Sequence, residues 1–273
     1  MSFESKSQSP LDYKSISYPG SMAEFRGPEV DLAQRQIVCI GGTETFGRFI
    51  AHPFSQVLAA GIGRPVANLG AMNAGLELIL NDAAINTALE TADHVVLQVT
   101  GAHLMTNRFY RVHPRRNDRF LRASSALSTV YRATDFTEFH FVRHMLSVLA
   151  EESADRFAIV VRELQDAWVA RMRSFINRID APVHLLWMAL HPPSEARPDL
   201  EQGTDPLFVT KSMLAEIVET ADTLTICDAT DDERAQPSYG MQFSPREIAA
   251  AKVLPGPSQH DRAASMLAEI VGS

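Results

Sequence analysis

The chain has little of what would assign it at once to a class of protein. It contains two cysteines in 273 residues, Cys39 and Cys227, and both fall in apolar stretches. That usage excludes a disulfide framework and a zinc site built on thiolates. No apolar run approaches the ~18 residues of a membrane helix, and the first fifteen residues lack the apolar core of a signal peptide. We therefore expect a cytoplasmic protein without a membrane span.

The chain also lacks the positive charge of a general nucleic-acid binder. Its formal net charge is −8, and 45% of its residues are hydrophobic. A long polyanion would be repelled by such a balance, so we expect no nucleic-acid partner. The length and the apolar fraction suit one large domain, because α/β folds of this size often do not split.

The stretch IVCIGGTETFG, residues 37–47, predicts a strand, a tight turn and the start of a helix. Four apolar residues without polar alternation are typical of a parallel strand buried on both faces. The two glycines, Gly41 and Gly42, allow a sharp turn and a close approach of other groups to the backbone. Such a turn lies at the carboxyl end of a strand, where open α/β sheets bind their ligands.

Four further apolar stretches follow, and helical periodicity separates most of them. The five predicted strands are residues 37–40, 65–69, 94–100, 183–190 and 223–229, with helices over 49–62, 76–89, 135–152, 155–179, 207–220, 245–252 and the C-terminus. This alternation predicts a three-layer α/β sandwich with a five-stranded, mostly parallel sheet. We expect residues 1–35 to form an extended N-terminal arm and residues 36–273 one domain, with an arginine-rich helical insertion at about residues 104–180.

Right-handed crossovers would gather the polar residues that end these strands at one edge of the sheet. These residues are Thr43, Asn68, Asn73, His103 and His191, with His260 within reach at the start of the last helix.

The insertion begins with a dense group of arginines in a chain that is acidic overall. Residues 108–122 hold six arginines against one acid, Asp118. Arg108, Arg115, Arg116 and Arg119 are our candidates for an anion site, because arginine forks match carboxylate, sulfate or phosphate. The same segment would otherwise be a solvated face or a contact between the copies of a homo-oligomer.

Four short motifs resemble the blocks of the SGNH, or GDSL-like, hydrolase superfamily. The stretch GGTETFG resembles its GDSxTxG block, NLG at residues 68–70 its oxyanion-hole block, GAHL at 101–104 its GxND block, and PSQH at 257–260 its DxxH block. The resemblance covers roughly residues 36–271 and implies the same sandwich fold, with the five predicted strands in the order 2-1-3-4-5. A closer kinship joins the chain to an uncharacterised bacterial family in which GGTET and RFYxVHPRRNDRF recur.

The resemblance also implies roles for individual residues. Thr43 takes the position of the nucleophile and His260 that of the base, while the backbone amides of Gly42 and Gly70 become oxyanion donors. Asn73 and His103 would complete the pocket. Three positions differ from the family: Gly42 and Pro257 replace aspartates, and His103 replaces an asparagine. Asp231, Asp232 or Glu44 could stand in for the missing triad acid.

Two functions from different classes remain open. The first is a hydrolase or acyl-transfer enzyme acting on an anionic, carbohydrate-linked ester. The second is a catalytically degenerate protein that uses the same cleft to bind an acidic glycan or a protein partner. Neither needs a cofactor, and we expect no metal, since His140 and His144, spaced as i and i+4 on a predicted helix, lack a further ligand motif.

Overall fold

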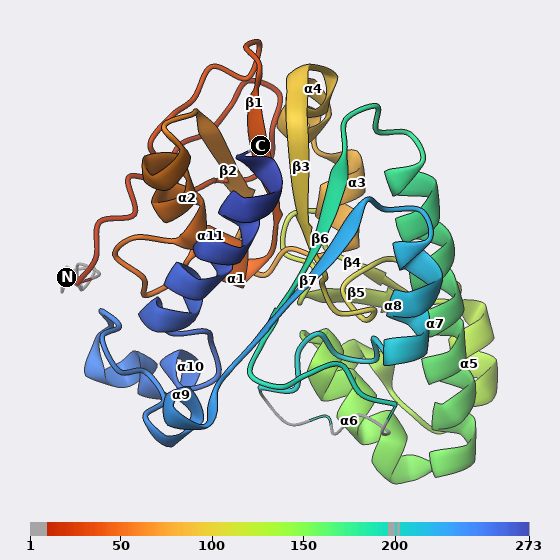
Figure 1. The fold of residues 1–273 in the computed structure, drawn as a ribbon. Coiled ribbons are helices and arrows are strands. Elements are labelled where there is room, and N and C mark those ends of the chain that lie inside the picture. The colour runs from red at the N-terminus through yellow and green to blue at the C-terminus, as the bar shows by residue number, and fades with distance from the viewer. Residues whose placement is uncertain (1–9, 196–199, 201–202, 273) are drawn as a thin grey trace, which may run out of the picture.

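The computed structural model describes residues 10–195, 200 and 203–272 (Figure 1). Five strands form one parallel sheet: β1 (Gln36–Gly41), β2 (Val66–Gly70), β3 (Ala92–Gln98), β6 (Val183–Ala189) and β7 (Thr223–Asp228). Their order is β2-β1-β3-β6-β7. This is the predicted order 2-1-3-4-5 once the two strands of the insertion are set aside. The predicted fold class is confirmed.

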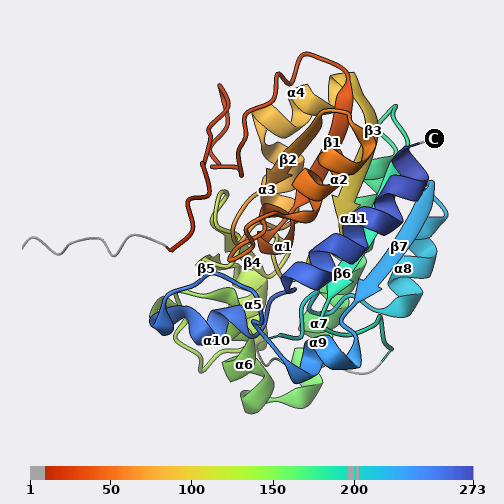
Figure 2. The same cartoon turned by 60° about the vertical axis from the view of Figure 1, so that its left-hand side comes forward.

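Strand β1 shows why the sheet is buried on both sides. Val38 and Ile40 point into the core under helices α3 (Leu76–Asn81), α4 (Ala83–Thr91), α7 (Ala154–Ile176) and α8 (Lys211–Val218). Ile37 and Cys39 point into a smaller core under α2 (Phe54–Ile62) and α11 (Pro257–Val271), which lie side by side in Figure 2. A strand that alternates between two apolar layers needs no polar face. Both cysteines are free and buried, as small apolar side chains would be.

The first crossover differs from the predicted helix over residues 49–62. A short helix, α1 (Thr43–Phe46), ends at Gly47, which has a φ of +74°, and α2 begins only after Pro53. The loop between them includes Phe49 at a φ of +69°. Its carbonyls receive the buried guanidinium of Arg26, which donates to the oxygens of Gly47, Ile50 and Ala51 at 2.9–3.1 Å. The periodic apolar residues of this loop are therefore core contacts and not helix faces.

Two other predicted helices also differ from expectation, one by an interruption and one by a later start. Residues 76–89 form α3 and α4, which are separated at Asp82 because its carboxylate caps α4 by accepting from the amides of Ala84 and Ile85. Helix α8 begins at Lys211 and not at residue 207, since Thr210 caps it. Local capping by short polar side chains decides both boundaries.

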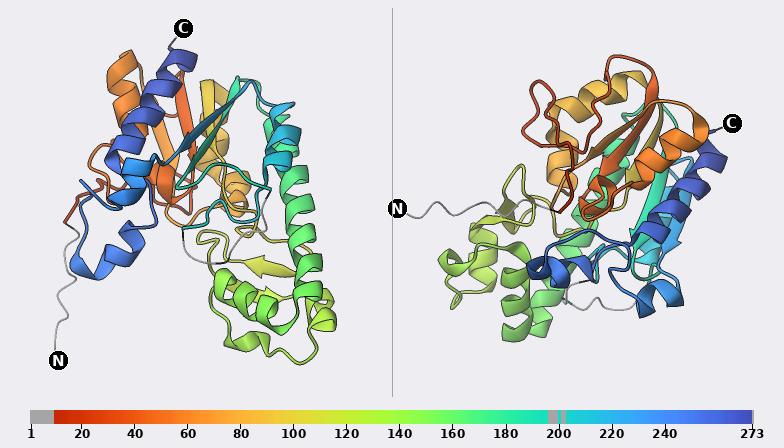
Figure 3. Two further views of the ribbon diagram at one scale, coloured as in Figure 1. Left: turned by 60° about the horizontal axis from the view of Figure 1, so that its bottom comes forward. Right: turned by 90° about the vertical axis from the view of Figure 1, so that its left-hand side faces the viewer.

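The insertion between β3 and β6 is not wholly helical, and the helix predicted over residues 135–152 begins only at Val142. It opens with an antiparallel pair, β4 (Tyr110–Val112) and β5 (Phe120–Ala123), before α5 (Ser125–Val130), η1 (Phe136–Glu138), α6 (Val142–Glu152) and α7. The pair and α6 lie beyond the carboxyl edge of the main sheet, at the same end as α9 (Asp231–Ala235) and α10 (Ile248–Ala251) (Figure 3). The 3-10 turn η2 (Pro245–Glu247) leads into α10.

The N-terminal arm contacts the body through aromatic rings. The ring centroid of Tyr13 lies 5.2 Å from that of Phe46, and Phe25 is fully buried. Within the described residues, no helix combines the length and the apolar character required to cross a membrane.

Candidate functional site

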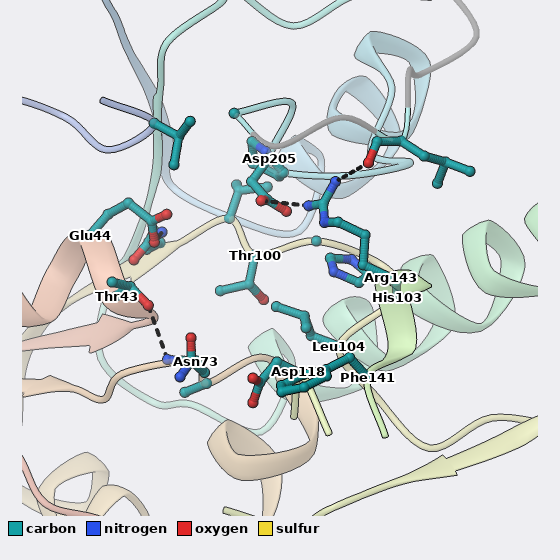
Figure 4. A pocket seen from close by; sticks show the side chains of 18 of the residues that line it. Thr43, Glu44, Asn73, Thr100, His103, Leu104, Asp118, Phe141, Arg143 and Asp205 are labelled. Atoms are coloured by element: carbon teal, nitrogen blue, oxygen red, sulfur yellow. Dashed lines mark hydrogen bonds and ion pairs between the residues drawn. The ribbon is translucent and has the colours of Figure 1, made fainter. Parts of the chain in front are cut away.

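A cavity of about 650 Å³ opens at the carboxyl edge of the sheet (Figure 4). Its wall comes from the β1–α1 turn, the loop after β2, the end of β3, the arginine-rich segment, α6 and the loop before α8. Its polar lining consists of Thr43, Glu44, Asn73, Gln98, Thr100, His103, Asp118, Arg143, His144, Ser147 and Asp205. Elements that are distant in the sequence therefore meet where the topology places the ligands of open α/β sheets.

Gln98, the last residue of β3, organises one side of this cavity. Its Oε1 accepts from the amides of Gly42 (2.9 Å) and Thr45 (3.2 Å) and from the Thr45 hydroxyl (2.6 Å). Its Nε2 donates to Oε2 of Glu44 at 2.7 Å. Burial raises the pKa of Glu44, and nearby Asp205 raises it further, while the bond from Gln98 opposes them. Glu44 thus presents a fixed carboxyl group that keeps its proton to a higher pH than usual.

One hydrogen bond joins the Thr43 side chain to the loop after β2. The Thr43 hydroxyl oxygen accepts it from the backbone amide of Asn73 at 3.0 Å, as Figure 4 shows. Asn73 has a φ of +58°, a conformation that asparagine tolerates better than most residues. The backbone carbonyl of Asn73 in turn accepts from the backbone amide of Asn117, at the tip of the β4–β5 hairpin. The arginine-rich segment is thereby tied to the backbone beside Thr43.

Three polar atoms in the cavity wall are buried without a hydrogen-bond partner among the described residues: Oγ1 of Thr100, Nδ1 of His103 and Oδ1 of Asp118. Buried polar atoms are paired in the great majority of cases. Burial also lowers the pKa of His103 to about 3, aided by Arg143 and opposed by Asp205, so the imidazole is neutral at pH 7. These three atoms lack partners, and they have almost no accessible surface, so a ligand in the cavity would reach them only after a rotation of their side chains.

The far side of the cavity is closed by a salt bridge. Arg143 of α6 lies 2.7 Å from Oδ2 of Asp205 and also donates to the Leu200 carbonyl (3.1 Å) and the Thr204 hydroxyl (3.3 Å). Its charge is compensated within the wall and joins the insertion to the loop before α8.

Three of the predicted site residues, Thr43, Asn73 and His103, line the same cavity. Two residues that sequence reasoning missed are central to it. Gln98 could have been noticed as the one amide side chain in the run HVVLQVT, since a polar residue in a buried strand needs partners. Arg143 carried no signal, because its pairing with Asp205 is made across the fold.

His260 lies away from this lining, in the first turn of α11. Its Nδ1 accepts from the Phe54 amide at 3.1 Å, and its ring stacks on that of Phe54 at 6.1 Å between centroids. In a neutral imidazole this leaves the proton on Nε2, the tautomer opposite to the one that a serine-hydrolase base uses. Burial, reinforced by the charge of Arg26, lowers the pKa of His260 to about 3. These contacts fit a structural histidine better than the predicted base.

The two glycines predicted as oxyanion donors already use their amides. The Gly42 amide donates to Gln98, and the Gly70 amide donates to Oδ1 of Asn68 at 3.0 Å. Gly70 has a packing role instead, because a Cβ there would lie 2.3 Å from the Phe46 nitrogen. An oxyanion role for either amide would require breaking these bonds.

The four predicted anion-binding arginines fall into two groups. Arg116 pairs with Asp118 at 3.3 Å, and the guanidinium of Arg119 lies 4.6 Å from the centre of the Phe141 ring. Arg108 and Arg115 are exposed. Among the described residues that line the cavity, none of the four appears, although their segment contributes Asp118 to its wall.

Solved structures with a similar arrangement share little sequence with this chain. A Lactobacillus plantarum protein from a structural genomics programme is 12% identical, with a TM-score of 0.39, covering 88% of this chain and 97% of its own. A lipase, Lip_vut3, from a goat rumen metagenome is 10% identical with a TM-score of 0.41 at the same coverages. BT4096, a gut microbial diltiazem-metabolizing enzyme, is 13% identical with a TM-score of 0.36, covering 88% of this chain and 47% of its own.

These scores carry no argument about chemistry, and the resemblance to SGNH hydrolases stays a prediction. No curated protein sequence matches the chain. The expected kinship with an uncharacterised family is confirmed, because the match extends over residues 1–273: the chain belongs to the family described as a domain of unknown function, DUF6473.

Proposed function

We propose that the cavity binds a small polar molecule that carries both hydrogen-bond donors and acceptors. The observation that carries this proposal is the polar lining of a cavity of about 650 Å³, in which hydroxyl, amide, imidazole and carboxyl groups surround one space. Three atoms of this lining, on Thr100, His103 and Asp118, have neither a hydrogen-bond partner nor accessible surface among the described residues. A ligand would pair with them after a rotation of their side chains, which would recover part of the ~1–3 kcal/mol that an unpaired buried group costs.

The charges of the wall favour an uncharged or cationic ligand over the anionic one expected from the sequence. The wall contains three carboxyl groups, those of Glu44, Asp118 and Asp205. Among the described lining residues, the one arginine is Arg143, and its charge is matched by Asp205. An anion entering this cavity would lose its hydration without gaining an uncompensated cation. A polyol or an amine-bearing polyol suits the wall better.

Three probes of similar size test this proposal: sorbitol, glucosamine and gluconate. A ligand that binds only the native state raises the melting temperature. We expect a rise at millimolar concentration with sorbitol or glucosamine, and none with gluconate. Thr100→Val, which removes one unpaired hydroxyl with little change of shape, should reduce the rise while leaving the ligand-free protein as stable or more so. A rise with gluconate alone, or with none of the three, would contradict the proposal.

A second candidate is acyl hydrolysis by Thr43 with Glu44 in the place of the base. The hydrogen bond that the backbone amide of Asn73 donates to the Thr43 hydroxyl favours it. This bond uses a lone pair of the hydroxyl oxygen, so the hydroxyl proton stays available for transfer to a base. Glu44, when ionised, would take that proton as the oxygen attacks an ester carbonyl carbon. It would return the proton to the leaving alcohol as the ester C–O bond breaks. Water would then attack the acyl carbon, giving a proton to Glu44, and that proton would pass to the Thr43 oxygen as the acyl–Thr43 bond breaks and the carboxylic acid leaves.

Turnover of p-nitrophenyl acetate tests this second candidate. We expect Thr43→Ala and Glu44→Gln each to abolish turnover and Thr43→Ser to keep it. Activity should rise with pH, because the base must be ionised and burial raises the pKa of Glu44. If the purified protein shows no turnover, or if both variants keep it, the hydrolytic candidate is wrong and the binding proposal stands on its own test.

A further inference from the structure

The β4–β5 hairpin has one apolar side and one positively charged side. Tyr110, Val112 and Phe120 are buried, whereas Arg111 and Arg122 are exposed. The pairing register shifts between Arg111 and Val112, so that β5 has an extra residue, Leu121, between the two pairs. This bulge lets Phe120 face the core while Arg122 faces outward.

The outward side brings two like charges into direct opposition. Arg111 and Arg122 are cross-strand partners in the register of the hairpin. Like charges in directly opposite positions destabilise an antiparallel pair. Arg108 and Arg115, at the base and at the tip of the hairpin, are exposed as well. We call these four residues the arginine face.

The arginine face is not neutralised by the protein itself. Within the described part of the chain, none of its four members forms an ion pair. The helical elements packed against β5 are α5, which contains no acidic residue, and η1. The carboxylate of Asp135, which caps η1, accepts from the amide and hydroxyl of Thr137, and Glu138 of η1 forms no ion pair within the described residues. Arg116 and Arg119 of the same segment are engaged by Asp118 and Phe141. Internal structure therefore accounts for those two arginines and not for the arginine face.

We propose that the arginine face docks a short acidic segment of a partner protein. Guanidinium forks match carboxylates in bidentate fashion. Leu121, which is 53% exposed between the charged positions, adds an apolar contact that suits a peptide. A long nucleic acid or an anionic membrane would also meet the rest of a chain whose net charge is −8, and would be repelled by it. A short acidic segment contacts the positive face alone.

A fluorescein-labelled peptide of twelve residues, rich in glutamate and containing two leucines, tests this proposal by fluorescence anisotropy. We expect micromolar binding to the full chain at low salt and a clear loss at higher salt, because surface charges are screened. Arg111→Gln/Arg122→Gln should weaken binding at least tenfold while the melting temperature stays or rises, since a repulsion has been removed.

Arg246→Gln/Lys252→Gln makes the same change of net charge at exposed positions outside the hairpin and is the matched control. It should keep nearly all of the affinity. The proposal is overturned if the peptide does not bind, if both double variants weaken binding equally, or if a single-stranded DNA of twelve nucleotides binds more tightly than the peptide. The single variants Arg111→Gln and Arg122→Gln repeat the measurement should the double variant fold poorly.

Discussion

Gln98 is the residue on which the polar end of the sheet depends most. One amide oxygen receives three hydrogen bonds from the GGTET turn, and the amide nitrogen fixes Glu44. Gly42, the N-cap residue of α1, has no side chain with which to hold this turn, and the hydrogen bonds to Gln98 hold it instead. The same hydrogen bonds join the end of β3 to the turn after β1 on one side of the cavity.

We therefore predict that Gln98→Met lowers the free energy of unfolding by about 3 kcal/mol or more, since it strands buried donors that each cost about 1–3 kcal/mol. Urea unfolding measures the change. Gln36→Leu is a suitable control, because Gln36 is equally buried but makes one long bond, 3.3 Å to the Asp31 carbonyl, and has an unpaired Oε1. An equal loss in both variants would show that the network around Gln98 adds nothing.

The two buried histidines predict a pH dependence of stability. Burial lowers the pKa of His103 and of His260 from 6.5 to about 3. Between these values the unfolded chain takes up protons that the folded chain does not, so stability is fully present above pH 6.5 and falls as the pH drops towards 3. Each histidine contributes up to about 1.4 kcal/mol per pH unit in that window.

Urea unfolding at pH 7.5 and at pH 5 measures this loss. We expect His103→Gln to lose less stability between the two pH values than the wild type, because one proton-linked site is gone. His52→Gln removes an exposed histidine and is the control. A loss that is the same in His103→Gln as in the wild type would mean that this histidine is protonated in the folded protein.

The loop at the tip of the β4–β5 hairpin acts as a cap for a helix elsewhere in the chain. Asn117 is fully buried, and its Oδ1 accepts from the amides of Gly75 (2.6 Å) and Leu78 (3.1 Å) at the start of α3. Its Nδ2 donates to the carbonyls of His113 and Pro114. Gly75 has no side chain with which to cap α3, so the insertion supplies one.

Replacing Asn117 by alanine should lower the free energy of unfolding by about 2 kcal/mol, the upper end for loss of a cap. It should also weaken binding of the polyol probes, because loss of the side-chain bonds frees the loop whose backbone amide at position 117 donates to the Asn73 carbonyl. Asn107→Ala is the matched control, since Oδ1 of Asn107 caps only the amides of Phe109 and Tyr110 within its own hairpin. Calorimetry of both variants separates the two effects, and unchanged probe affinity in Asn117→Ala would contradict a role in positioning the site.

At the scale of the whole molecule, much of the architecture follows from local patterns. Apolar runs located the five strands, and their alternation with helical periodicity predicted a parallel sheet, whose strand order came from the resemblance to a known superfamily. The helix boundaries were less accurate, because Gly47, Asp82 and Thr210 interrupt apolar periodicity through turn and capping geometry. The short strands β4 and β5 were missed since the arginines conceal the alternation of Tyr110 and Val112.

The candidate site could be predicted only in part. Strand ends converge by topology, which is why Thr43, Asn73 and His103 were expected at one edge and line one cavity. The PSQH motif at residues 257–260 predicted that His260 begins the last helix, but it could not predict the hydrogen bonds of the imidazole. The Phe54 amide and the charge of Arg26 define its environment, and both come from the loop that replaced a predicted helix. Side chains that depend on long-range partners, such as Arg143 with Asp205, had no local signature.

One short loop connects the two surfaces of the molecule that are proposed to bind. Residues 113–118 include Arg115 of the arginine face, Asn117, whose backbone amide donates to the Asn73 carbonyl, and Asp118 in the cavity wall. A partner that shifts this loop would move two walls of the cavity together, and a ligand that fixes the walls would fix the loop. Such linkage is reciprocal in free energy. Whatever factor the acidic segment imposes on the affinity of the small molecule, the small molecule must impose on the segment, which would make this protein a two-input sensor.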